Sequence, residues 1–273
     1  MTDPIFPGPL WLVGCGNMAG AMLGRWLEEG IDPARVSVIR PSGRAGGEGV
    51  RVTTSWPEDE VPAIVMLGMK PHQLDAVAPG LAPILDPGTI LVSILAGVEL
   101  ASLRARFPAP RTIVRAMPNL PVRIGKGVVL LASERDDPSA RALVTALMAP
   151  LGHAEWIEQE THFQLAGHLT GAGPAFLFRF TEALAAAAGQ LGLPPEQALR
   201  LALFMVEGAG ALAAAFEDDP ATLARKVASP GGTTEAGLQV LDADGALRAL
   251  VQRTLDASRV RGLELAAAAR TSD

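Results

Sequence analysis

Short apolar runs alternate with amphipathic stretches through the first half of the chain. Apolar runs bounded by turn residues predict strands, and apolar positions spaced three or four apart predict helices. The predicted strands are 10–14, 36–40, 51–55, 63–69, 89–95, 112–117, 127–133 and 153–157. The predicted helices among them are 18–29, 74–85, 100–106 and 139–148. This alternation is typical of a mostly parallel sheet covered by helices on both faces.

The pattern changes after about residue 160, where helical stretches replace strands. The longer predicted helices are 176–189, 196–216 and 245–269, with smaller ones between them. Pro174 suits the first position of the earliest of these helices. The segment 197–216 is apolar around nearly its whole circumference, as expected of a helix buried on most sides. The few helices predicted after residue 160 cannot cover this segment alone. We therefore expect a second copy of the chain to cover the rest of its apolar surface. The alternative is a central helix in a monomeric bundle.

Composition narrows the classes of partner and location. The 273 residues include 29 acidic and 23 basic side chains, a net charge of −6, which favours neither nucleic acid nor an anionic membrane as partner. The single cysteine, Cys15, excludes an intrachain disulfide. The N-terminal segment lacks signal-peptide features, and no long uncharged apolar stretch indicates a membrane span. We expect a soluble, cytoplasmic protein.

The turn VGCGNMAG joins the first predicted strand to the first predicted helix. Gly14 and Gly16 occupy the first two glycines of the dinucleotide-binding pattern G-x-G-x-x-G/A, and Ala19 takes the third place. Gly14 would form the tight turn, and Gly16 would let a pyrophosphate approach the backbone. Asn17 and Met18 would then lie beside the phosphates at the start of the helix. The alternative is an ordinary strand–helix turn.

The second strand indicates which cofactor is bound. NAD sites place an acidic residue near the end of this strand, where it bonds the ribose 2′-hydroxyl. Between residues 36 and 47 there is none, and Arg40, Ser42 and Arg44 could instead bind a 2′-phosphate. We therefore expect NADPH, with NADH possible. Alternatively, the arginines are solvated loop charges.

Three later strand ends carry residues at the edge where such a sheet binds the nicotinamide half. Lys70 and Pro71 follow one strand, Ala96 follows the next, and Asn119 follows the strand after that. Lys70 is one of only three lysines, and it could equally be a surface lysine that ends a strand. All four residues belong to the expected cofactor site.

The loop SPGGTT lies between apolar helical stretches in the second half of the chain. The consecutive backbone N–H groups of Gly231, Gly232, Thr233 and Thr234 could form a concavity that binds an anion such as a substrate carboxylate. The alternative is a turn that caps the following helix, with one of the threonines as N-cap.

Together these motifs identify a resemblance to the pyrroline-5-carboxylate reductase family. It is carried by GCGNMA, MKPHQ, SILAGV, VRAMPNLP, TGAGPAF and SPGGTTEAGL. The resemblance implies an α/β fold, with an N-terminal Rossmann-type doubly wound parallel sheet at 1–159. At 160–273 it implies an all-α domain for substrate binding and for homodimerisation, with higher oligomers possible. It also implies NADPH- or NADH-dependent reduction of 1-pyrroline-5-carboxylate to L-proline, the last step of proline biosynthesis.

The resemblance also implies a role for each residue of the loop. Ser229, Gly231, Gly232 and Thr233 would hold the substrate carboxylate, and Thr234 would lie near the ring nitrogen. No histidine–aspartate pair or lysine stands out as a proton donor, and the histidines show no metal-ligand spacing, so no metal is expected. A cyclic imine can arrive protonated, and hydride transfer then gives the amine without an acid catalyst. We therefore expect Thr234 to orient the nitrogen.

Two positions depart from the family pattern. Family members often have asparagine at the position of Ile39 and threonine at the position of Leu120. These departures bear on cofactor preference and on the details of the site more than on the reaction.

Other functions remain to be weighed against this resemblance. A β-hydroxyacid dehydrogenase would need a lysine in the first helix of the second domain, and residues 160–190 contain none. A reductase of a related cyclic imine carboxylate, such as a six-membered ring, and a non-catalytic dinucleotide-binding regulator remain as alternatives.

Overall fold

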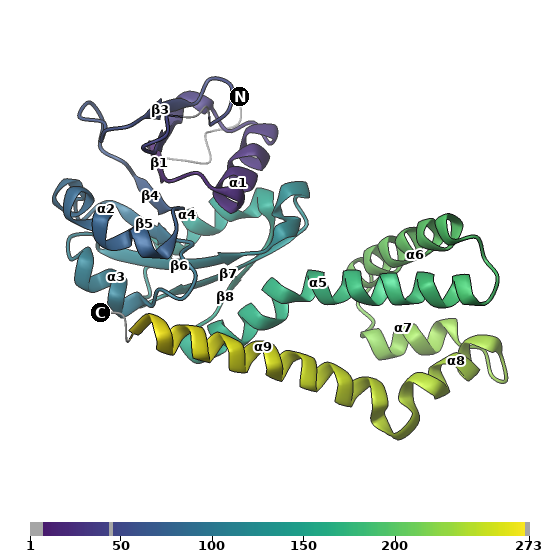
Figure 1. Ribbon diagram of the computed structural model, residues 1–273. Helices are drawn as coiled ribbons and strands as arrows, with labels where there is room; N and C mark the ends of the chain where they lie inside the picture. Colours follow the sequence, from purple (N-terminus) through teal and green to yellow (C-terminus); the bar gives the residue numbers. More distant parts are fainter. Residues whose placement is uncertain (1–7, 44–45, 271–273) are drawn as a thin grey trace. The chain divides into compact units, whose positions relative to one another are not determined.

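The computed structural model describes residues 8–43 and 46–270, and of 265–270 only the course of the helix. Arg44, expected near a 2′-phosphate, lies outside this part. The chain divides into two compact units, one formed by the chain up to Gly171 with the segment from Leu265 onward, the other by Ala172–Glu264. The division falls inside a long helix, α5 (Glu160–Gln190), rather than in front of it (Figure 1).

The first unit is built on an eight-stranded sheet with the order β3-β2-β1-β4-β5-β6-β7-β8. The strands are β1 (Leu10–Val13), β2 (Val36–Ile39), β3 (Arg51–Thr53), β4 (Ile64–Leu67), β5 (Ile90–Ser93), β6 (Thr112–Pro118), β7 (Gly127–Ser133) and β8 (Gly152–Trp156). All neighbours pair in parallel except β6 and β7, whose short connection leaves no room for a crossover. The expected, mostly parallel sheet is confirmed. The strand order reverses between β1 and β4, and this switch point is where open α/β sheets bind ligands.

Helices cover both faces of the sheet (Figure 1). Successive strand residues point to opposite faces, so Leu10 and Leu12 pack in one apolar cluster and Trp11 and Val13 in the other. The helices that complete the first cluster are α1 (Asn17–Glu28) and α4 (Pro138–Met148). The second cluster is completed by α2 (Leu74–Leu81) and α3 (Leu100–Arg106). Burial of both faces explains why the strands appear in the sequence as continuous apolar runs.

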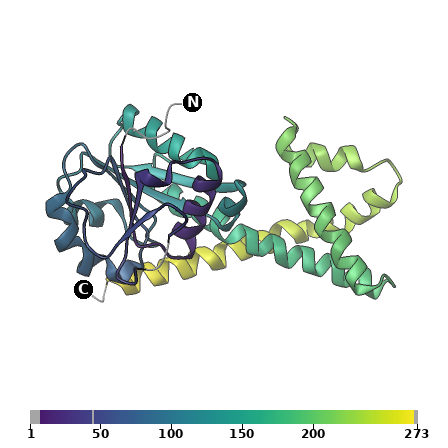
Figure 2. The same ribbon diagram turned by 90° about the horizontal axis from the view of Figure 1, so that it is seen from above.

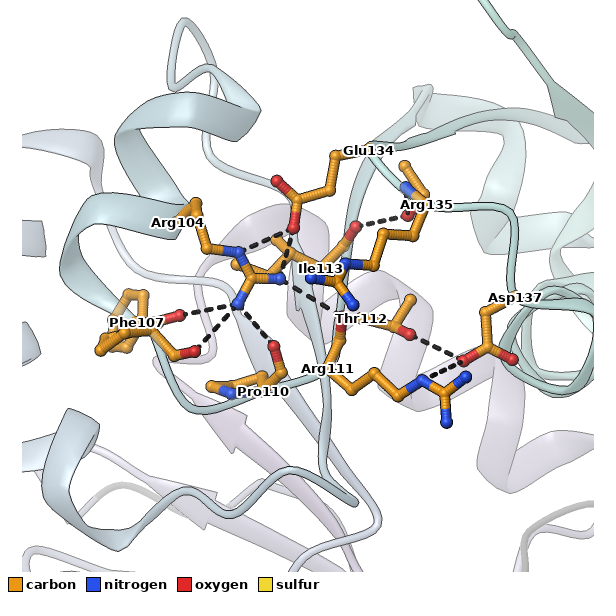
Figure 3. Close-up of polar contacts among 11 residues, drawn as sticks. Arg104, Phe107, Pro110, Arg111, Thr112, Ile113, Glu134, Arg135 and Asp137 are labelled. Carbon is orange, nitrogen blue, oxygen red and sulfur yellow. Dashed lines mark hydrogen bonds and ion pairs between the residues drawn. The ribbon is translucent and has the colours of Figure 1, made fainter.

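Arg104 on α3 braces the segment that leads into β6, as Figure 3 shows. Its guanidinium Nη1 donates to the carbonyl oxygen of Pro110 at 2.6 Å and to that of Phe107 at 3.3 Å. The same side chain forms an ion pair with Glu134, which follows β7. One arginine thereby ties the start of β6 to the end of its antiparallel neighbour.

Asp137 connects β6 to α4 in the same region (Figure 3). Its carboxylate accepts hydrogen bonds from Thr112 Oγ1 at 3.0 Å and from the backbone nitrogen of Ala140 at 3.1 Å, and it is the N-cap of α4. The Ala140 N–H and then the Thr112 hydroxyl hold the pKa of Asp137 below its ordinary value, because both bonds favour the charged carboxylate.

The second unit is formed by helices alone within its described residues (Figure 2). It contains parts of α5 and α9 (Ala246–Arg270) together with α6 (Pro195–Ala215), α7 (Pro220–Val227) and α8 (Thr233–Asp242). The helices predicted at 196–216 and 245–269 match α6 and α9 closely. The absence of strands after residue 160 is also confirmed for the described part of the chain.

The prediction that Pro174 opens a helix is wrong. Helix α5 begins at Glu160 and continues through Pro174 to Gln190. A proline in a helix leaves the carbonyl four residues earlier without a donor, which here is the carbonyl of Thr170. The side-chain nitrogen Nδ2 of Asn119 donates to that oxygen at 3.0 Å. A side chain that directly follows β6 thus supplies the hydrogen bond that the proline removes.

Helix α6 has little cover within the described chain. Ala198 and Ala202 are its buried residues, whereas Leu203 is 53% exposed and Phe204 67% exposed. The helix was expected to be buried on most sides, so its apolar surface requires cover from outside the described chain. By length and composition α6 could also cross a membrane.

Candidate functional site

The turn between β1 and α1 cannot hold a larger residue at its first glycine. Gly14 has a φ of +81°, and an added Cβ would lie 2.7 Å from the backbone nitrogen of Met69. The N–H of Gly14 donates to the carbonyl oxygen of Ile39 at 2.8 Å, which fixes the turn against the end of β2. Backbone conformation and close packing therefore both require glycine here.

The N-terminus of α1 is open to a ligand. Gly16 is the N-cap, with extended backbone and no capping side chain. An added Cβ on Gly16 would meet only the carbonyl oxygen of Gly68, at 3.9 Å. The first N–H groups of α1, at Asn17 and Met18, are consequently not blocked by a capping side chain. This is the geometry in which helix N-termini bind phosphate groups.

Arg40 and Ser42 lie beside this turn, directly after β2. Arg40 Nη1 donates to the carbonyl oxygen of Cys15 at 3.3 Å, which ties the arginine to the glycine turn. The backbone N–H of Gly43 donates to the carbonyl of Arg40 at 3.2 Å, so the segment reverses at once and Ser42 is exposed. A guanidinium and a hydroxyl placed together are suited to binding a phosphate.

These segments line one pocket of about 850 Å³ at the carboxyl ends of the central strands. Its volume lies within the range of small-molecule sites. The expected cofactor residues that line it are Gly14, Gly16, Asn17, Met18, Arg40, Ser42, Lys70, Pro71 and Ala96. The structure therefore brings together residues that the sequence distributes over four separate loops.

Further residues of the pocket were not anticipated from the sequence. They are Thr54, Trp56, Gln73, Val77 and Ile94. Thr54 and Trp56 come directly after β3, whose carboxyl end lies at the same edge as those of β1 and β2. Their place after a strand of the parallel sheet was the feature of the sequence that could have predicted them, because every loop at this edge of the sheet can contribute to the site.

Cys15 lines the pocket but is not activated. Its side chain is half-buried, and burial raises the pKa of the thiol above its ordinary value. The positive charge of Arg40 opposes this shift without cancelling it. The thiol is therefore a weak nucleophile at neutral pH, since the reactive form is the thiolate.

Asn119 is placed differently from the other expected cofactor residues. It is not among the residues that line the pocket, and its side chain is 7% exposed. Its Nδ2 donates to the Thr170 carbonyl at 3.0 Å, and its Oδ1 accepts from the backbone nitrogen of Val128 at 2.9 Å. The amide is thus already engaged at both ends, and a contact with a cofactor stays a prediction.

The loop SPGGTT turns directly into α8 in the second unit. The backbone N–H of Gly232 donates to the carbonyl of Ser229 at 2.9 Å, and Gly231 has a φ of +70°. A proline followed by a glycine of positive φ at the turn centre is typical of a type II turn. Gly232 is the N-cap of α8, and Thr233 and Thr234 are its first two residues. The loop does begin a helix, but the alternative in which a threonine is the N-cap is wrong.

The glycine N–H groups of this loop are already hydrogen bonded. Gly231 donates to Oε2 of Glu235 at 2.7 Å, and Gly232 donates to Ser229. Within the described residues, the N–H groups of Thr233 and Thr234 have no acceptor, and both side chains are exposed. The loop therefore leaves the amides and hydroxyls of these two threonines exposed at the start of α8. Binding by the glycine amides stays a prediction.

Two family models match the chain. The model described as pyrroline-5-carboxylate reductase dimerisation matches residues 160–265, which contain the SPGGTT loop and α6. The model described as NADP oxidoreductase, coenzyme F420-dependent, matches residues 10–97, which contain the glycine turn and every residue that lines the pocket.

Curated relatives match nearly the whole chain. The pyrroline-5-carboxylate reductase of Pseudomonas aeruginosa is 36% identical over 93% of this chain and 95% of its own length. The Synechocystis enzyme of the same name is 34% identical over 92% of this chain and 96% of its own length.

Solved structures agree with this similarity. A pyrroline-5-carboxylate reductase from Coxiella burnetii has a TM-score of 0.88 and 32% identity, covering 95% of this chain and 99% of its own. The Plasmodium falciparum pyrroline carboxylate reductase with NADP bound has a TM-score of 0.78 and 23% identity, covering 94% of this chain and 97% of its own. The second similarity shows a shared fold.

Proposed function

The chain belongs to the pyrroline-5-carboxylate reductase family. On that premise we propose which of its residues bind the cofactor, which bind the substrate and which orient the substrate for reduction. The protein is an oxidoreductase that reduces the C=N bond of 1-pyrroline-5-carboxylate with NAD(P)H, forming L-proline in proline biosynthesis. The observation that carries this function is the pocket of about 850 Å³, which collects the residues of a dinucleotide site around an open glycine turn.

The residues of the pocket fit a nicotinamide dinucleotide. Gly14 keeps the turn tight, Gly16 leaves the start of α1 open to phosphates, and Arg40 adds positive charge. When bound, the reduced cofactor supplies the hydride. In this proposal Lys70, Pro71 and Ala96, which follow β4 and β5, line its nicotinamide half. Asn119 would join them only through a contact additional to its two hydrogen bonds.

NADPH is the preferred cofactor in this proposal. The support comes from Arg40 and Ser42, which lie at the end of β2 where the ribose 2′ position is bound. Residues 36–43 contain no carboxylate that would bond a 2′-hydroxyl. We expect a higher kcat/KM with NADPH than with NADH under equal conditions. Equal or better turnover with NADH would contradict the assignment.

The loop at the start of α8 is the proposed substrate site, formed by Ser229 and residues 231–234. The N–H groups of Thr233 and Thr234 have no acceptor in the described chain, and a helix N-terminus carries partial positive charge. Both features favour a carboxylate there. Ser229 and the two glycines shape the turn that directs these amides outward.

Thr234 is the proposed catalytic residue. Its hydroxyl would orient the ring nitrogen while the loop holds the carboxylate, so that the C=N carbon faces the hydride. The substrate binds as the protonated imine, whose carbon accepts the hydride while the nitrogen keeps its proton, giving the neutral amine. No side chain needs to donate a proton in this step, and orientation contributes most of the catalysis.

A homodimer is the proposed assembly, and further association of dimers is compatible with it. The dimerisation match spans α6, whose exposed apolar side chains require cover. Although α6 passes a length and composition criterion for a membrane span, it carries Glu196, Arg200 and Glu207. We therefore propose that a second copy covers the surface of α6. We also propose that the protein is cytoplasmic, with neither membrane nor nucleic acid as partner.

The proposed domains are 1–159 and 160–273. The match to the dimerisation family model begins at residue 160, which supports this boundary.

One assay tests the function directly. The purified protein should oxidise NADPH, followed at 340 nm, when 1-pyrroline-5-carboxylate is added, and L-proline should appear in equal amount. The six-membered imine 1-piperideine-2-carboxylate serves as the comparison substrate. Higher kcat/KM with that ring would reassign the substrate. NADPH binding without oxidation of NADPH by either imine would instead favour a dinucleotide-binding regulator.

A further inference from the structure

Glu235 reaches back from the first turn of α8 into the substrate loop. It is the third residue of the helix, its side chain is half-buried, and its Oε2 accepts the hydrogen bond of the Gly231 N–H at 2.7 Å. The bond extends past Gly232, the N-cap, to the residue in front of it. Neither substrate binding nor cofactor binding as described above uses this carboxylate.

This bond selects the orientation of one peptide group. Type I and type II turns differ by a rotation of about 180° of the central peptide, which changes the sign of φ at the third residue. Glycine accepts both signs, so Gly231 does not by itself select either form. The observed φ of +70° goes with an N–H that points at Glu235. The carboxylate therefore stabilises the form of the turn that is present.

The same bond determines which donors of the loop remain for a ligand. The N–H of Gly231 is engaged by Glu235, and that of Gly232 is engaged by the Ser229 carbonyl. The amides of Thr233 and Thr234 are left at the N-terminus of α8. If the central peptide rotated, the Gly231 N–H would leave the carboxylate and the carbonyl before it would turn towards the opposite side.

We infer that Glu235 is a positioning residue for the substrate carboxylate. By holding the turn in one form, it directs the carboxylate to the Thr233 and Thr234 amides, next to the hydroxyl that orients the ring nitrogen. The inference rests on the proposed function of this loop. It assigns to Glu235 an effect on substrate binding through its hydrogen bond rather than through its charge.

Two substitutions separate the hydrogen bond from the charge. Glu235→Ala removes both, whereas Glu235→Gln removes the charge but keeps an oxygen that can accept from Gly231. Asp242→Asn is the control, because Asp242 is an exposed carboxylate at the other end of α8 whose side chain makes no capping bond. For the full-length protein, KM and kcat for 1-pyrroline-5-carboxylate are measured at saturating NADPH. Calorimetry gives the Kd of L-proline and of NADPH.

In Glu235→Ala we expect KM and the Kd of L-proline to rise about tenfold, the order of effect of one intramolecular hydrogen bond. The change in kcat should stay within about twofold, and the Kd of NADPH should be unchanged, because the cofactor pocket is untouched. Glu235→Gln should keep KM within about threefold of the unmodified protein, and the control should behave like the unmodified protein.

Three results would overturn the inference while leaving the proposed function intact. They are an unchanged KM in Glu235→Ala, an equal rise in KM in Glu235→Gln, and a loss confined to kcat. If the unmodified protein fails to oxidise NADPH with 1-pyrroline-5-carboxylate, the proposed function is wrong and the inference falls with it. Far-ultraviolet circular dichroism of each variant shows whether α8 and the other helices are retained.

Discussion

Replacement of Asn119 should lower stability rather than cofactor affinity. The side chain is 7% exposed and bonds the Thr170 carbonyl at 3.0 Å and the Val128 N–H at 2.9 Å. In Asn119→Ala both backbone groups lose their partner, and each unpaired buried group costs about 1–3 kcal/mol. Because both groups are only partly buried, we expect a total of about 2–4 kcal/mol. For a domain of this size that lowers Tm by roughly 4–16 °C.

Pro174 allows one of the two hydrogen bonds to be tested separately. In Pro174→Ala a backbone N–H becomes available to the Thr170 carbonyl, so Asn119 is no longer its only donor. Asn119→Ala should therefore cost about 1–2 kcal/mol less in the Pro174→Ala background than in the unmodified protein. Asn119→Asp is a companion variant that keeps the acceptor for Val128 and replaces the donor by a negatively charged oxygen, so its cost is compared with and without Pro174→Ala.

Urea denaturation followed by circular dichroism gives the four free energies of unfolding of this cycle. All variants are compared at one protein concentration, because assembly makes apparent stability depend on concentration. Additivity of the two substitutions within about 0.5 kcal/mol would refute the reasoning, since the cycle would then show no coupling between Asn119 and Pro174. A weaker NADPH Kd in Asn119→Ala at unchanged stability would instead support the cofactor contact that the sequence predicts.

Four further substitutions test other parts of the structure. Gly14→Ala should weaken the NADPH Kd at least about tenfold, because its Cβ would lie 2.7 Å from Met69 at a positive φ; calorimetry measures this, and an unchanged Kd would contradict it. Thr234→Ala should lower kcat/KM for 1-pyrroline-5-carboxylate about tenfold or more, and full turnover with unchanged KM would exclude its proposed role. Asp137→Asn should lower stability at neutral pH and flatten its acid dependence. The pKa of Asp137 is lowered in the folded protein, so the stabilisation is present above the unfolded pKa of about 4 and is lost as pH falls through the folded pKa; equal slopes of stability against pH for both proteins would argue against this. Phe204→Glu places a charge on the exposed face of α6 and should shift the protein from dimer to monomer in sedimentation velocity, so an unaltered mass would remove α6 from the interface.

The positions of most strands and helices could be predicted because local pattern determines them. The strands β1, β4 and β5 are apolar runs bounded by turn residues, and both faces of the sheet are buried. The glycine turn was also predictable, since the positive φ at Gly14 follows from the tight passage from strand to helix. In each case the physical cause lies within a few residues of the feature itself.

Other features depend on contacts between distant segments. Helix α5 passes through Pro174 because Asn119, 51 residues before Thr170 in the chain, supplies a hydrogen bond to the Thr170 carbonyl. Local propensity alone predicts that the helix begins at the proline, and the prediction was accordingly wrong. Trp56 was missed in the pocket for a related reason, because the order of the strands brings the end of β3 to the same edge as β1 and β2.

By itself, the sequence determined the class of fold, the glycine turn, most of the residues on four loops that line one pocket, and the loop that begins α8. These follow from periodicity, from the conformational freedom of glycine and from the resemblance of the motifs to one family. Only the tertiary structure decided which polar groups are already engaged. Asn119 bonds the backbone at both ends, and the Gly231 amide is held by Glu235, which leaves the amides of Thr233 and Thr234 for a ligand. The physical reason is that a hydrogen-bonding group has few partners, and their identity is set by distances in space that a linear pattern does not contain.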